Sequence, residues 1–311
     1  MKKSGSALTV ADDILTLDDL RKWSVPGTAL AVLGHPIHHS VSPPMHNAAL
    51  AEMAAESPAF SDWRYYRFEV PPDQLETALK LLHRKRFRGV NLTVPHKVIA
   101  FDLIKTIDPS ARSVGAVNTL RWHPDGYEGF NTDGYGLVQG LREDLRTDLS
   151  GADVILLGAG GAGRGAAIES IAQACHSLSI GNRTRQRAEE LRTLLWQIDP
   201  AAKVRVFDPG SPPSDLPEDA LVINATSAGL KPTDPQPINL SALPGTPRVF
   251  DMIYNPAETA LLGSARSRGF AFANGFSMLV YQGARSLEIW SDTRVPVKAM
   301  FRGARQGMAS N

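Results

Sequence analysis

The sequence predicts an α/β protein of two domains, and three observations support this prediction. The chain has 311 residues, enough for two domains of about 150 residues each. Short apolar segments alternate with segments of helical periodicity along most of its length. One apolar segment, residues 154–157, is a continuous run of Val-Ile-Leu-Leu, which is typical of a strand buried in a parallel sheet. We therefore expect mainly parallel sheets with helices packed against them.

Composition and charge exclude several classes of protein. The 33 Lys and Arg residues against 32 Asp and Glu give a net charge of +1, so the positive surface of a typical nucleic-acid-binding protein is absent. The hydrophobic content of 43% is too high for a disordered chain, and no apolar stretch approaches the roughly 20 residues of a membrane span. A single cysteine, Cys175, excludes an internal disulfide and a cysteine-based zinc cluster. Aspartates interrupt the apolar residues of the N-terminus, so we expect no signal peptide and a cytoplasmic location.

The order of the expected elements divides the chain into two domains. Residues 1–27 are expected to form an extension with a short helix that Thr16 caps. The first domain should then contain strands at 29–33, 65–70 and 90–94 and helices at 45–55 and 75–82. The second should contain strands at 154–157, 178–181, 203–207, 221–224 and 248–251 and helices at 166–175 and 187–198. A later helical segment, 278–290, does not extend this series, so we assign residues 1–135 and 276–311 to one domain and 136–275 to the other.

A glycine-rich motif predicts that the second domain binds a dinucleotide. Gly158, Gly160 and Gly163 form G-x-G-x-x-G directly between an apolar strand and a helix. There the glycines allow a tight turn and let the backbone approach a pyrophosphate at the helix N-terminus, as in a Rossmann domain. The expected cofactor contacts are Gly158, Ala159, Gly160, Gly161, Ala162 and Gly163. A glycine-rich turn without a ligand is the alternative.

The loop after the next expected strand favours NADP over NAD. NAD-selective sites usually carry Asp or Glu there, whereas this loop reads Asn182-Arg183-Thr184-Arg185, with Arg187 just beyond. Arginine and hydroxyl side chains can bind a 2′-phosphate through charge-assisted hydrogen bonds. The alternative is a solvated basic loop. Thr226, which follows a later strand of the same sheet, is a further candidate on the cofactor side unless its segment is only a turn.

Polar side chains also gather after the strands of the first domain. They are Ser40 and Ser42 on a proline-rich loop, Asn91, Thr93 and Lys97 at the end of a strand, and Asn118 and Asp133 further on. Such groups suit a small polyhydroxylated acid, with Lys97 and Asp133 as a pair for proton transfer. Taken singly, Lys97 could be a surface lysine, Asp133 a helix cap and Ser42 a turn residue. Four nearby histidines, His35, His38, His39 and His46, have no accompanying carboxylates, so we expect no metal site.

Together these motifs resemble the NADP-dependent shikimate dehydrogenase family from about Leu30 to Trp290. In the first domain the matching motifs are H-S-x-S-P at 39–43, N-x-T-x-P-x-K at 91–97, G-A-V-N-T at 115–119 and N-T-D-x-x-G at 131–136. In the second they are G-A-G-G-A-G at 158–163, N-R-T-x-x-R at 182–187 and N-A-T-S-x-G-L at 224–230, followed by D-M-x-Y-N-P-x-E-T at 251–259 and G-x-x-M-L-V-x-Q at 275–282. The resemblance implies a substrate domain, a Rossmann domain and an active site in the cleft between them. The N-terminal extension and the tail after residue 290 lie outside the match.

The resemblance also implies a reaction and a role for each site residue. The reaction is the reversible reduction of 3-dehydroshikimate to shikimate by NADPH, in the pathway to aromatic amino acids. Ser40 and Ser42 would bind the substrate carboxylate, and Lys97, paired with Asp133, would transfer the proton. The ring hydroxyls would be bound by Thr93, Asn118, Asp133 and Gln282, with Asn91 and Tyr254 nearby. The cofactor 2′-phosphate would be bound by Asn182, Arg183, Thr184 and Arg187, and Met278 would lie near the nicotinamide.

Other functions stay open at this point. A shikimate/quinate dehydrogenase could use NAD or both cofactors, although the second serine of the loop, which relatives that accept quinate often change, is retained here as Ser42. A catalytically silent paralogue that only senses a ligand would keep the glycines and lose the Lys97–Asp133 pair, which this chain has. We expect a small-molecule substrate, no nucleic acid and no membrane as partners, and a monomer or a homodimer. Lys97 could act as the acid and base itself, which is our hypothesis, or chiefly stabilise the developing alkoxide.

Overall fold

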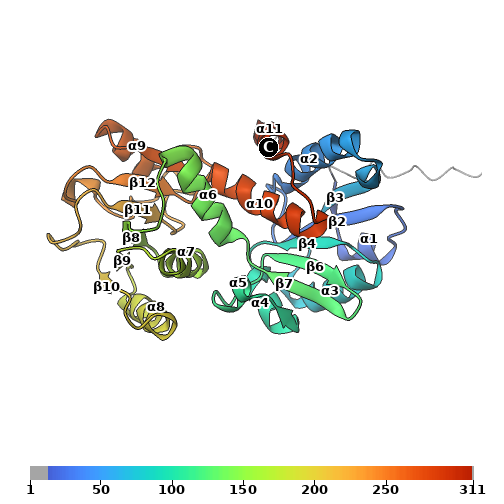
Figure 1. Ribbon diagram of the computed structural model, residues 1–311, viewed down its shortest axis with the longest axis horizontal. Helices are drawn as coiled ribbons and strands as arrows, with labels where there is room; N and C mark the ends of the chain where they lie inside the picture. The colour runs from blue at the N-terminus through green and yellow to red at the C-terminus, as the bar shows by residue number, and fades with distance from the viewer. Residues whose placement is uncertain (1–12, 310–311) are drawn as a thin grey trace, which may run out of the picture. The chain divides into compact units, whose positions relative to one another are not determined.

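The computed structural model describes residues 13–309, which fold into two compact units. The first unit contains the described residues up to Thr132 and those from Gly283 onward, and the second contains Asp133–Gln282. Each unit has one sheet with helices beside it (Figure 1). The predicted α/β class with mainly parallel sheets is confirmed. The assignment of substrate binding to one domain and cofactor binding to the other stays a prediction.

The sheet of the first unit has seven strands in the order β1-β3-β2-β4-β6-β7-β5. They are β1 (Ile14–Leu15), β2 (Thr28–Gly34), β3 (Trp63–Glu69), β4 (Gly89–Leu92), β5 (Thr106–Ile107), β6 (Thr119–His123) and β7 (Gly126–Phe130). Most neighbours run parallel, but β6 runs antiparallel to both β4 and β7. We did not predict the β6–β7 hairpin, although Asp125, which lies between the two strands, and Gly126, which begins β7, form an Asp-Gly hairpin signal.

Helices of the first unit come from both ends of the chain. They are α1 (Leu17–Arg21), α2 (Ser42–Glu56), α3 (Leu75–Arg84), α4 (His96–Leu103), α5 (Pro109–Arg112) and α11 (Val297–Ala309), with single 3-10 turns at Pro58–Phe60 and Pro72–Gln74. Helix α10 (Phe276–Ser291) begins in the second unit and ends in the first. Near its end Trp290 is fully buried, and its indole N–H donates to the Leu120 carbonyl oxygen of β6 at 2.9 Å. The last part of α10 is therefore anchored to the first sheet.

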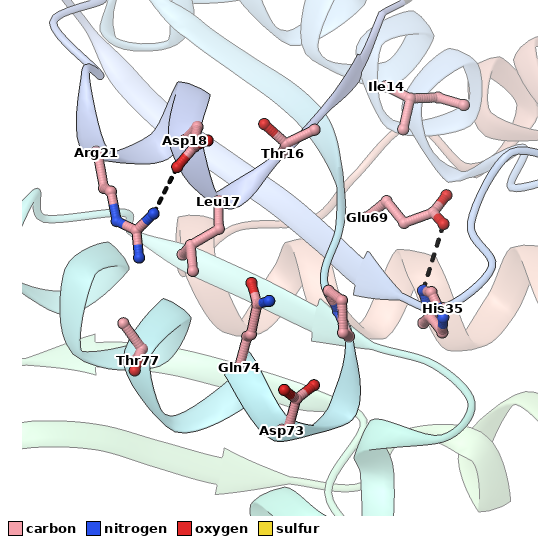
Figure 2. Close-up of a pocket in the computed structure, with 11 residues that line it drawn as sticks. Ile14, Thr16, Leu17, Asp18, Arg21, His35, Glu69, Asp73, Gln74 and Thr77 are labelled. Atoms are coloured by element: carbon pink, nitrogen blue, oxygen red, sulfur yellow. Dashed lines mark hydrogen bonds and ion pairs between the residues drawn. The ribbon is translucent and has the colours of Figure 1, made fainter.

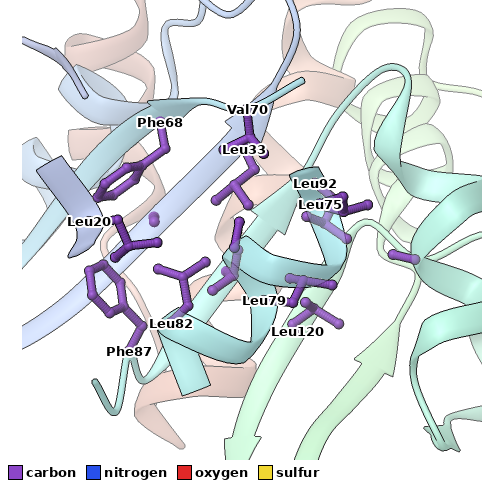
Figure 3. Packing of buried hydrophobic residues seen from close by; sticks show 14 of the residues in the cluster. Leu20, Leu33, Phe68, Val70, Leu75, Leu79, Leu82, Phe87, Leu92 and Leu120 are labelled. Carbon is purple, nitrogen blue, oxygen red and sulfur yellow. The ribbon is translucent and has the colours of Figure 1, made fainter. Parts of the chain in front are cut away.

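The N-terminal extension contributes to the core of the first unit. The predicted cap of α1 is confirmed: Thr16 Oγ1 accepts from the Asp19 N–H at 3.4 Å, and Asp19 Oδ2 accepts from the Thr16 N–H at 2.8 Å. Leu20 of this helix is fully buried, and Figure 3 shows it beside the rings of Phe68 and Phe87. The extension lies outside the family motifs, yet part of it fills the core.

The sheet of the second unit has six parallel strands in the order β10-β9-β8-β11-β12-β13. They are β8 (Asp153–Leu157), β9 (Ser177–Gly181), β10 (Val204–Phe207), β11 (Leu221–Asn224), β12 (Arg248–Asp251) and β13 (Phe272–Asn274). The accompanying helices are α6 (Asp133–Leu145), α7 (Gly161–Ala172), α8 (Arg185–Ile198) and α9 (Ala260–Ser267), with a 3-10 turn at Leu240–Ala242. In chain order these strands read 3-2-1-4-5-6, the order of a Rossmann domain. The order reverses between β8 and β11, so a ligand crevice is expected outside their carboxyl ends.

Helix α7 differs from its predicted range. It begins at Gly161 rather than at residue 166, because the glycines themselves form its first turn, and it ends at Ala172. Cys175 therefore lies beyond the helix that we expected to include it. Burial, with Asp153 nearby, raises the pKa of the Cys175 thiol to about 11, so the thiolate is scarce at neutral pH.

The lengths of the helices and the placement of potential metal ligands bear on membrane and metal binding. Among residues 13–309, no helix is both long and apolar enough to cross a membrane. Within the same part of the chain, no group of three or more His, Cys, Asp or Glu side chains is placed to hold a metal ion.

Candidate active site

Several predicted substrate residues lie at the carboxyl ends of two neighbouring strands, β2 and β4. Ser40 and Ser42 follow β2, and Ser40 Oγ accepts a hydrogen bond from the Ser42 N–H at 3.3 Å. Thr93 follows β4 and lies beside Gly34, where an added Cβ would come within 2.6 Å of the threonine methyl carbon. Lys97 is the second residue of α4 and is partly buried. The two segments therefore meet at one edge of the sheet, the edge at which α/β proteins bind ligands.

Two details of the predicted arrangement are wrong. Ser42 is not on a loop: it is the first residue of α2, and the two prolines that follow suit the first turn of a helix. The strand that carries Asn91 ends at Leu92 rather than at residue 94. Asn91 is the penultimate residue of β4, at the carboxyl end of the strand as predicted, and its side chain is buried.

Asn91 and Asn118 belong to one buried hydrogen-bonded network. Asn91 Nδ2 donates to the Asn118 carbonyl oxygen at 3.1 Å and to Ser286 Oγ at 3.0 Å, while Asn91 Oδ1 accepts from the Tyr65 hydroxyl at 2.7 Å. Asn118 Oδ1 accepts from the Thr132 N–H at 2.9 Å, and Asn118 Nδ2 donates to Thr132 Oγ1 at 2.9 Å. No sequence pattern singled out Tyr65 and Ser286, which lie outside the motifs. Thr132 stands inside one, the Asn-Thr-Asp segment.

The remaining predicted substrate residues lie in the second unit. Asp133 is the first residue of α6 and directly follows Thr132 of the network. Gln282 lies on α10, where its Nε2 donates to the Leu279 carbonyl oxygen at 2.9 Å. Tyr254 follows β12, and burial raises the pKa of its phenol. Asp133 and Gln282 thus stand at the two points where the chain passes between the units.

The glycine motif has the geometry that a dinucleotide loop requires. Gly158 has a φ of +106°, which side chains rarely tolerate. Gly163 lies against the carbonyl of Gly158, where an added Cβ would be 2.1 Å from the Gly158 oxygen. Gly160 is the N-cap of α7 and provides no side-chain cap, so the first N–H groups of the helix are available to an anion.

The loop between β9 and α8 is tied to the glycine motif by Asn182. Its Oδ1 accepts from the Ala159 N–H at 3.1 Å, and its Nδ2 donates to the Thr184 carbonyl oxygen at 2.8 Å. Both Arg183 and Arg187 are exposed, and in the part of the chain that the structure describes neither forms an ion pair. The two segments predicted to bind the cofactor are therefore adjacent, and two guanidinium groups remain available to a phosphate.

Thr226 and Met278 complete the predicted cofactor residues. Thr226 lies beside the glycine motif, since a Cβ on Gly158 would come within 3.0 Å of its methyl carbon. Met278 packs against α6, where a Cβ on Gly136 would lie 2.6 Å from the Met278 carbonyl oxygen. The structure thus brings Thr226 to the dinucleotide loop, whereas Met278 lies at the contact of α6 with α10.

His46 is fully buried and is not placed for metal binding. Neither ring nitrogen has a hydrogen-bond partner among the described residues, and the ring stacks on that of Tyr65 with centroids 4.1 Å apart. Burial lowers the pKa of His46 to about 3. The side chain is therefore a neutral aromatic group of the core at neutral pH.

Replacing His46 by phenylalanine is expected to flatten the acid side of the stability profile. Because burial lowers the pKa of His46 from 6.5 to about 3, the unfolded chain binds a proton over this range that the folded protein excludes. The wild type should then lose free energy of unfolding as the pH falls below about 6.5, by up to about 1.4 kcal/mol per pH unit from this residue. Denaturant unfolding at several pH values measures the slope. Equal slopes for the wild type and His46→Phe would contradict this expectation, whatever the absolute stability of the variant.

A separate cavity of about 640 Å³ lies in the first unit between the N-terminal extension and α3. Figure 2 shows Asp18, Arg21, Glu69, Asp73 and Gln74 among the residues around it, with an ion pair between Asp18 and Arg21. None of the predicted substrate or cofactor residues lines this cavity. It therefore adds nothing to the site built from the motifs.

Comparisons with known proteins decide the family. Two family models match, the shikimate dehydrogenase substrate binding domain at residues 32–120 and the shikimate 5'-dehydrogenase C-terminal domain at residues 275–300. A shikimate dehydrogenase (NADP(+)) of Symbiobacterium thermophilum is 40% identical over 283 residues, which cover 90% of this chain and 94% of the relative. The chain belongs to the shikimate dehydrogenase family.

Other members of the shikimate dehydrogenase family agree in sequence and in fold. A shikimate dehydrogenase (NADP(+)) of Methanopyrus kandleri is 35% identical, with 87% of this chain and 92% of the relative covered. The crystal structure of shikimate 5-dehydrogenase from Thermus thermophilus in complex with NADP(H) and shikimate gives a TM-score of 0.78 at 31% identity, covering 90% of this chain and 99% of that chain. The predicted family is therefore confirmed. The roles of individual residues stay predictions.

Proposed function

We propose that this chain is an NADP-dependent shikimate dehydrogenase, an oxidoreductase that interconverts 3-dehydroshikimate and shikimate in the pathway to aromatic amino acids. One observation carries the proposal. This chain belongs to the family, has all of the substrate motifs, and has a dinucleotide loop that is followed by arginines in place of an acid. The relatives named shikimate dehydrogenase (NADP(+)), at 40% and 35% identity, support both the reaction and the cofactor.

The second unit fits NADP through its own residues. Backbone N–H groups at the start of α7 would bind the pyrophosphate, since Gly158 and Gly163 let it approach the backbone. Arg183 of the loop and Arg187 of the first turn of α8 would bind the 2′-phosphate by charge-assisted hydrogen bonds, while Asn182 holds the loop against the glycine motif. When bound, the reduced cofactor supplies the hydride. Selectivity for NADP over NAD then comes from the two arginines.

The first unit would bind the substrate at the carboxyl ends of β2 and β4. The hydroxyl groups of Ser40 and Ser42 would donate to the substrate carboxylate. Thr93 and Asn118 would bind the ring hydroxyls, joined by Tyr254 and Gln282 of the second unit. Because Asn118 is held at both ends of its amide by Thr132, its orientation is set before the substrate arrives. Such pre-organisation lowers the entropic cost of placing the reacting carbon.

Lys97 would act as the general acid and base of the reaction. In the direction of reduction its ammonium donates a proton to the ketone oxygen as hydride reaches the carbon, which leaves a neutral amine and a hydroxyl group. In the direction of oxidation the amine takes that proton from the hydroxyl. Asp133 would orient the Lys97 side chain and bind a ring hydroxyl. Acid–base transfer by Lys97, rather than electrostatic stabilisation alone, is part of this proposal.

Three further predictions, on domain division, location and oligomeric state, accompany the proposal. We keep the substrate domain at residues 1–135 and 276–311 and the cofactor domain at 136–275 as a functional division. A cytoplasmic location and a monomer or homodimer also stay predictions. The binding of a small-molecule substrate is supported by the Thermus thermophilus relative, whose structure contains shikimate and NADP(H).

Initial rates with four substrate–cofactor pairs test the proposed function. Shikimate and quinate are each assayed with NADP+ and with NAD+, and shikimate with NADP+ is expected to give the highest kcat/KM. A higher value for quinate with NAD+ would replace the proposal with a quinate dehydrogenase. Binding of shikimate without turnover in any pair would instead indicate a ligand-sensing paralogue.

A further inference from the structure

We infer that Tyr65 is a positioning residue for the substrate: its hydroxyl orients the amide of Asn91, and its ring and backbone hold the start of α2, where Ser42 lies. This inference rests on the proposed function, which places Asn91 and Ser42 at the substrate. Tyr65 itself is fully buried on β3 and is not among the residues that the motifs predicted.

The donors and acceptors around Asn91 allow one orientation of its amide. Asn91 Nδ2 faces the Asn118 carbonyl oxygen at 3.1 Å, a group that can only accept, so the amide nitrogen must lie on that side. Asn91 Oδ1 then faces the Tyr65 hydroxyl, which donates to it at 2.7 Å. A reversed amide would set two oxygens against each other at Asn118. Tyr65 is therefore the donor that completes this buried group.

The other end of the same network runs through Ser286 of α10. Its hydroxyl oxygen accepts from Asn91 Nδ2 at 3.0 Å and lies 2.7 Å from Thr119 Oγ1 and 3.3 Å from Thr132 Oγ1. All of these residues lie in the first unit, and each is buried. Ser286 thus connects Asn91 with the residue that holds Asn118. A substitution at either Tyr65 or Ser286 therefore alters the hydrogen bonds that hold the two amides proposed to bind substrate. It leaves the residues proposed to bind the cofactor unchanged.

Tyr65 also fixes the start of α2. The Asn47 side chain is hydrogen-bonded to both backbone groups of Tyr65, accepting from its N–H at 2.9 Å and donating to its carbonyl oxygen at 2.9 Å. The ring of His46 stacks on the Tyr65 ring with an interplanar angle of 2°. His46 is one helical turn from Ser42 and so lies on the same face of α2. Burial raises the pKa of the Tyr65 phenol, and the Ser42 side chain partly opposes that rise, which places Ser42 near the phenol as well.

Steady-state kinetics of Tyr65→Phe test the inference. The variant keeps the ring and the backbone contacts and removes the one donor to Asn91 Oδ1. We expect the KM for shikimate to rise about tenfold, with kcat and the KM for NADP+ each within about twofold of the wild type. A residue that served stability alone would not produce this split, because a loss of folded protein lowers the apparent kcat and leaves both KM values in place.

Tyr127→Phe is the matched control. Tyr127 is also a buried tyrosine of the first unit, and its hydroxyl donates to the Phe87 carbonyl oxygen at 3.0 Å, outside the network. Its removal costs a comparable hydrogen bond, so we expect a similar loss of stability with the KM for shikimate unchanged. Equal KM changes in the two variants, or no KM change in a folded Tyr65→Phe protein, would overturn the inference.

Ser286→Ala is a second test of the same hydrogen-bonded network. It can replace Tyr65→Phe if that variant does not fold. It removes one acceptor of the Asn91 amide, and we expect the KM for shikimate to rise about threefold without a change in the KM for NADP+. An unchanged KM would count against the inference. If the wild type fails to turn over shikimate, the proposed function fails and the inference fails with it, whereas an active wild type with unresponsive variants refutes the inference alone.

Discussion

Lys97→Ala is expected to lower kcat by about two to four orders of magnitude, with a modest change in the KM for shikimate. The lysine supplies the proton of the reaction, and removal of a general acid typically costs a factor of about 10² to 10⁴. The effect should appear in kcat and in kcat/KM alike, because the proton transfer belongs to the transition state and contributes little to ground-state binding. Steady-state rates with shikimate and NADP+ measure it, and a variant with near-normal kcat would defeat the assignment.

Two further variants sharpen the experiment on Lys97. Lys105→Ala removes an exposed lysine shortly after α4 and should leave the kinetics unchanged. Lys97→Arg keeps a positive charge but cannot release its proton, because the pKa of a guanidinium lies above about 12. If Lys97 acts as acid and base, Lys97→Arg should be nearly as slow as Lys97→Ala. Recovery of most of the rate would show that the charge alone is sufficient.

Arg183→Ala is expected to lower kcat/KM with NADP+ by about tenfold to a hundredfold and to leave kcat/KM with NAD+ almost unchanged. A hydrogen bond to a charged group contributes about 1.5–3 kcal/mol, which corresponds to this range, and NAD+ lacks the phosphate that would accept it. Arg183 is exposed and forms no ion pair within residues 13–309, so the substitution breaks no existing salt bridge. Kinetics with both cofactors measure the change in selectivity.

Arg185→Ala is the matched control for cofactor selectivity. Arg185 is two residues away, at the start of α8, and its guanidinium pairs with Glu189 of the same helix at 3.2 Å. We expect its removal to leave the ratio of the two kcat/KM values close to that of the wild type. A parallel fall with both cofactors in Arg183→Ala, or an equal loss of selectivity in Arg185→Ala, would place the 2′-phosphate elsewhere.

The second unit could be predicted well because its signals are local. The run Val154–Leu157 is apolar throughout. Gly158 has a positive φ, and Gly163 lies too close to the Gly158 carbonyl to leave room for a Cβ, so both positions favour glycine. The first residues of α7 were nevertheless misplaced, because glycine has a low helix propensity, so these residues were expected to lie outside the helix.

The first unit shows where prediction from the sequence stops. Ser42, Thr93 and Lys97 could be chosen from their motifs, but the burial of Asn91 depends on Tyr65, Thr119 and Ser286, which are distant in the chain. Such contacts leave no periodic pattern in a single sequence. The same holds for Leu20 of the extension, whose packing against Phe68 and Phe87 only the folded chain reveals.

A crystal structure of the complex with shikimate and NADP+ tests the central claim most directly, namely that residues of the two units act on one substrate hydroxyl. We predict Lys97 Nζ and an Asp133 carboxylate oxygen within about 3 Å of the same hydroxyl group, with Ser42 at the substrate carboxylate. A complex in which shikimate occupies another place, or in which Lys97 and Asp133 contact no common substrate atom, would contradict it.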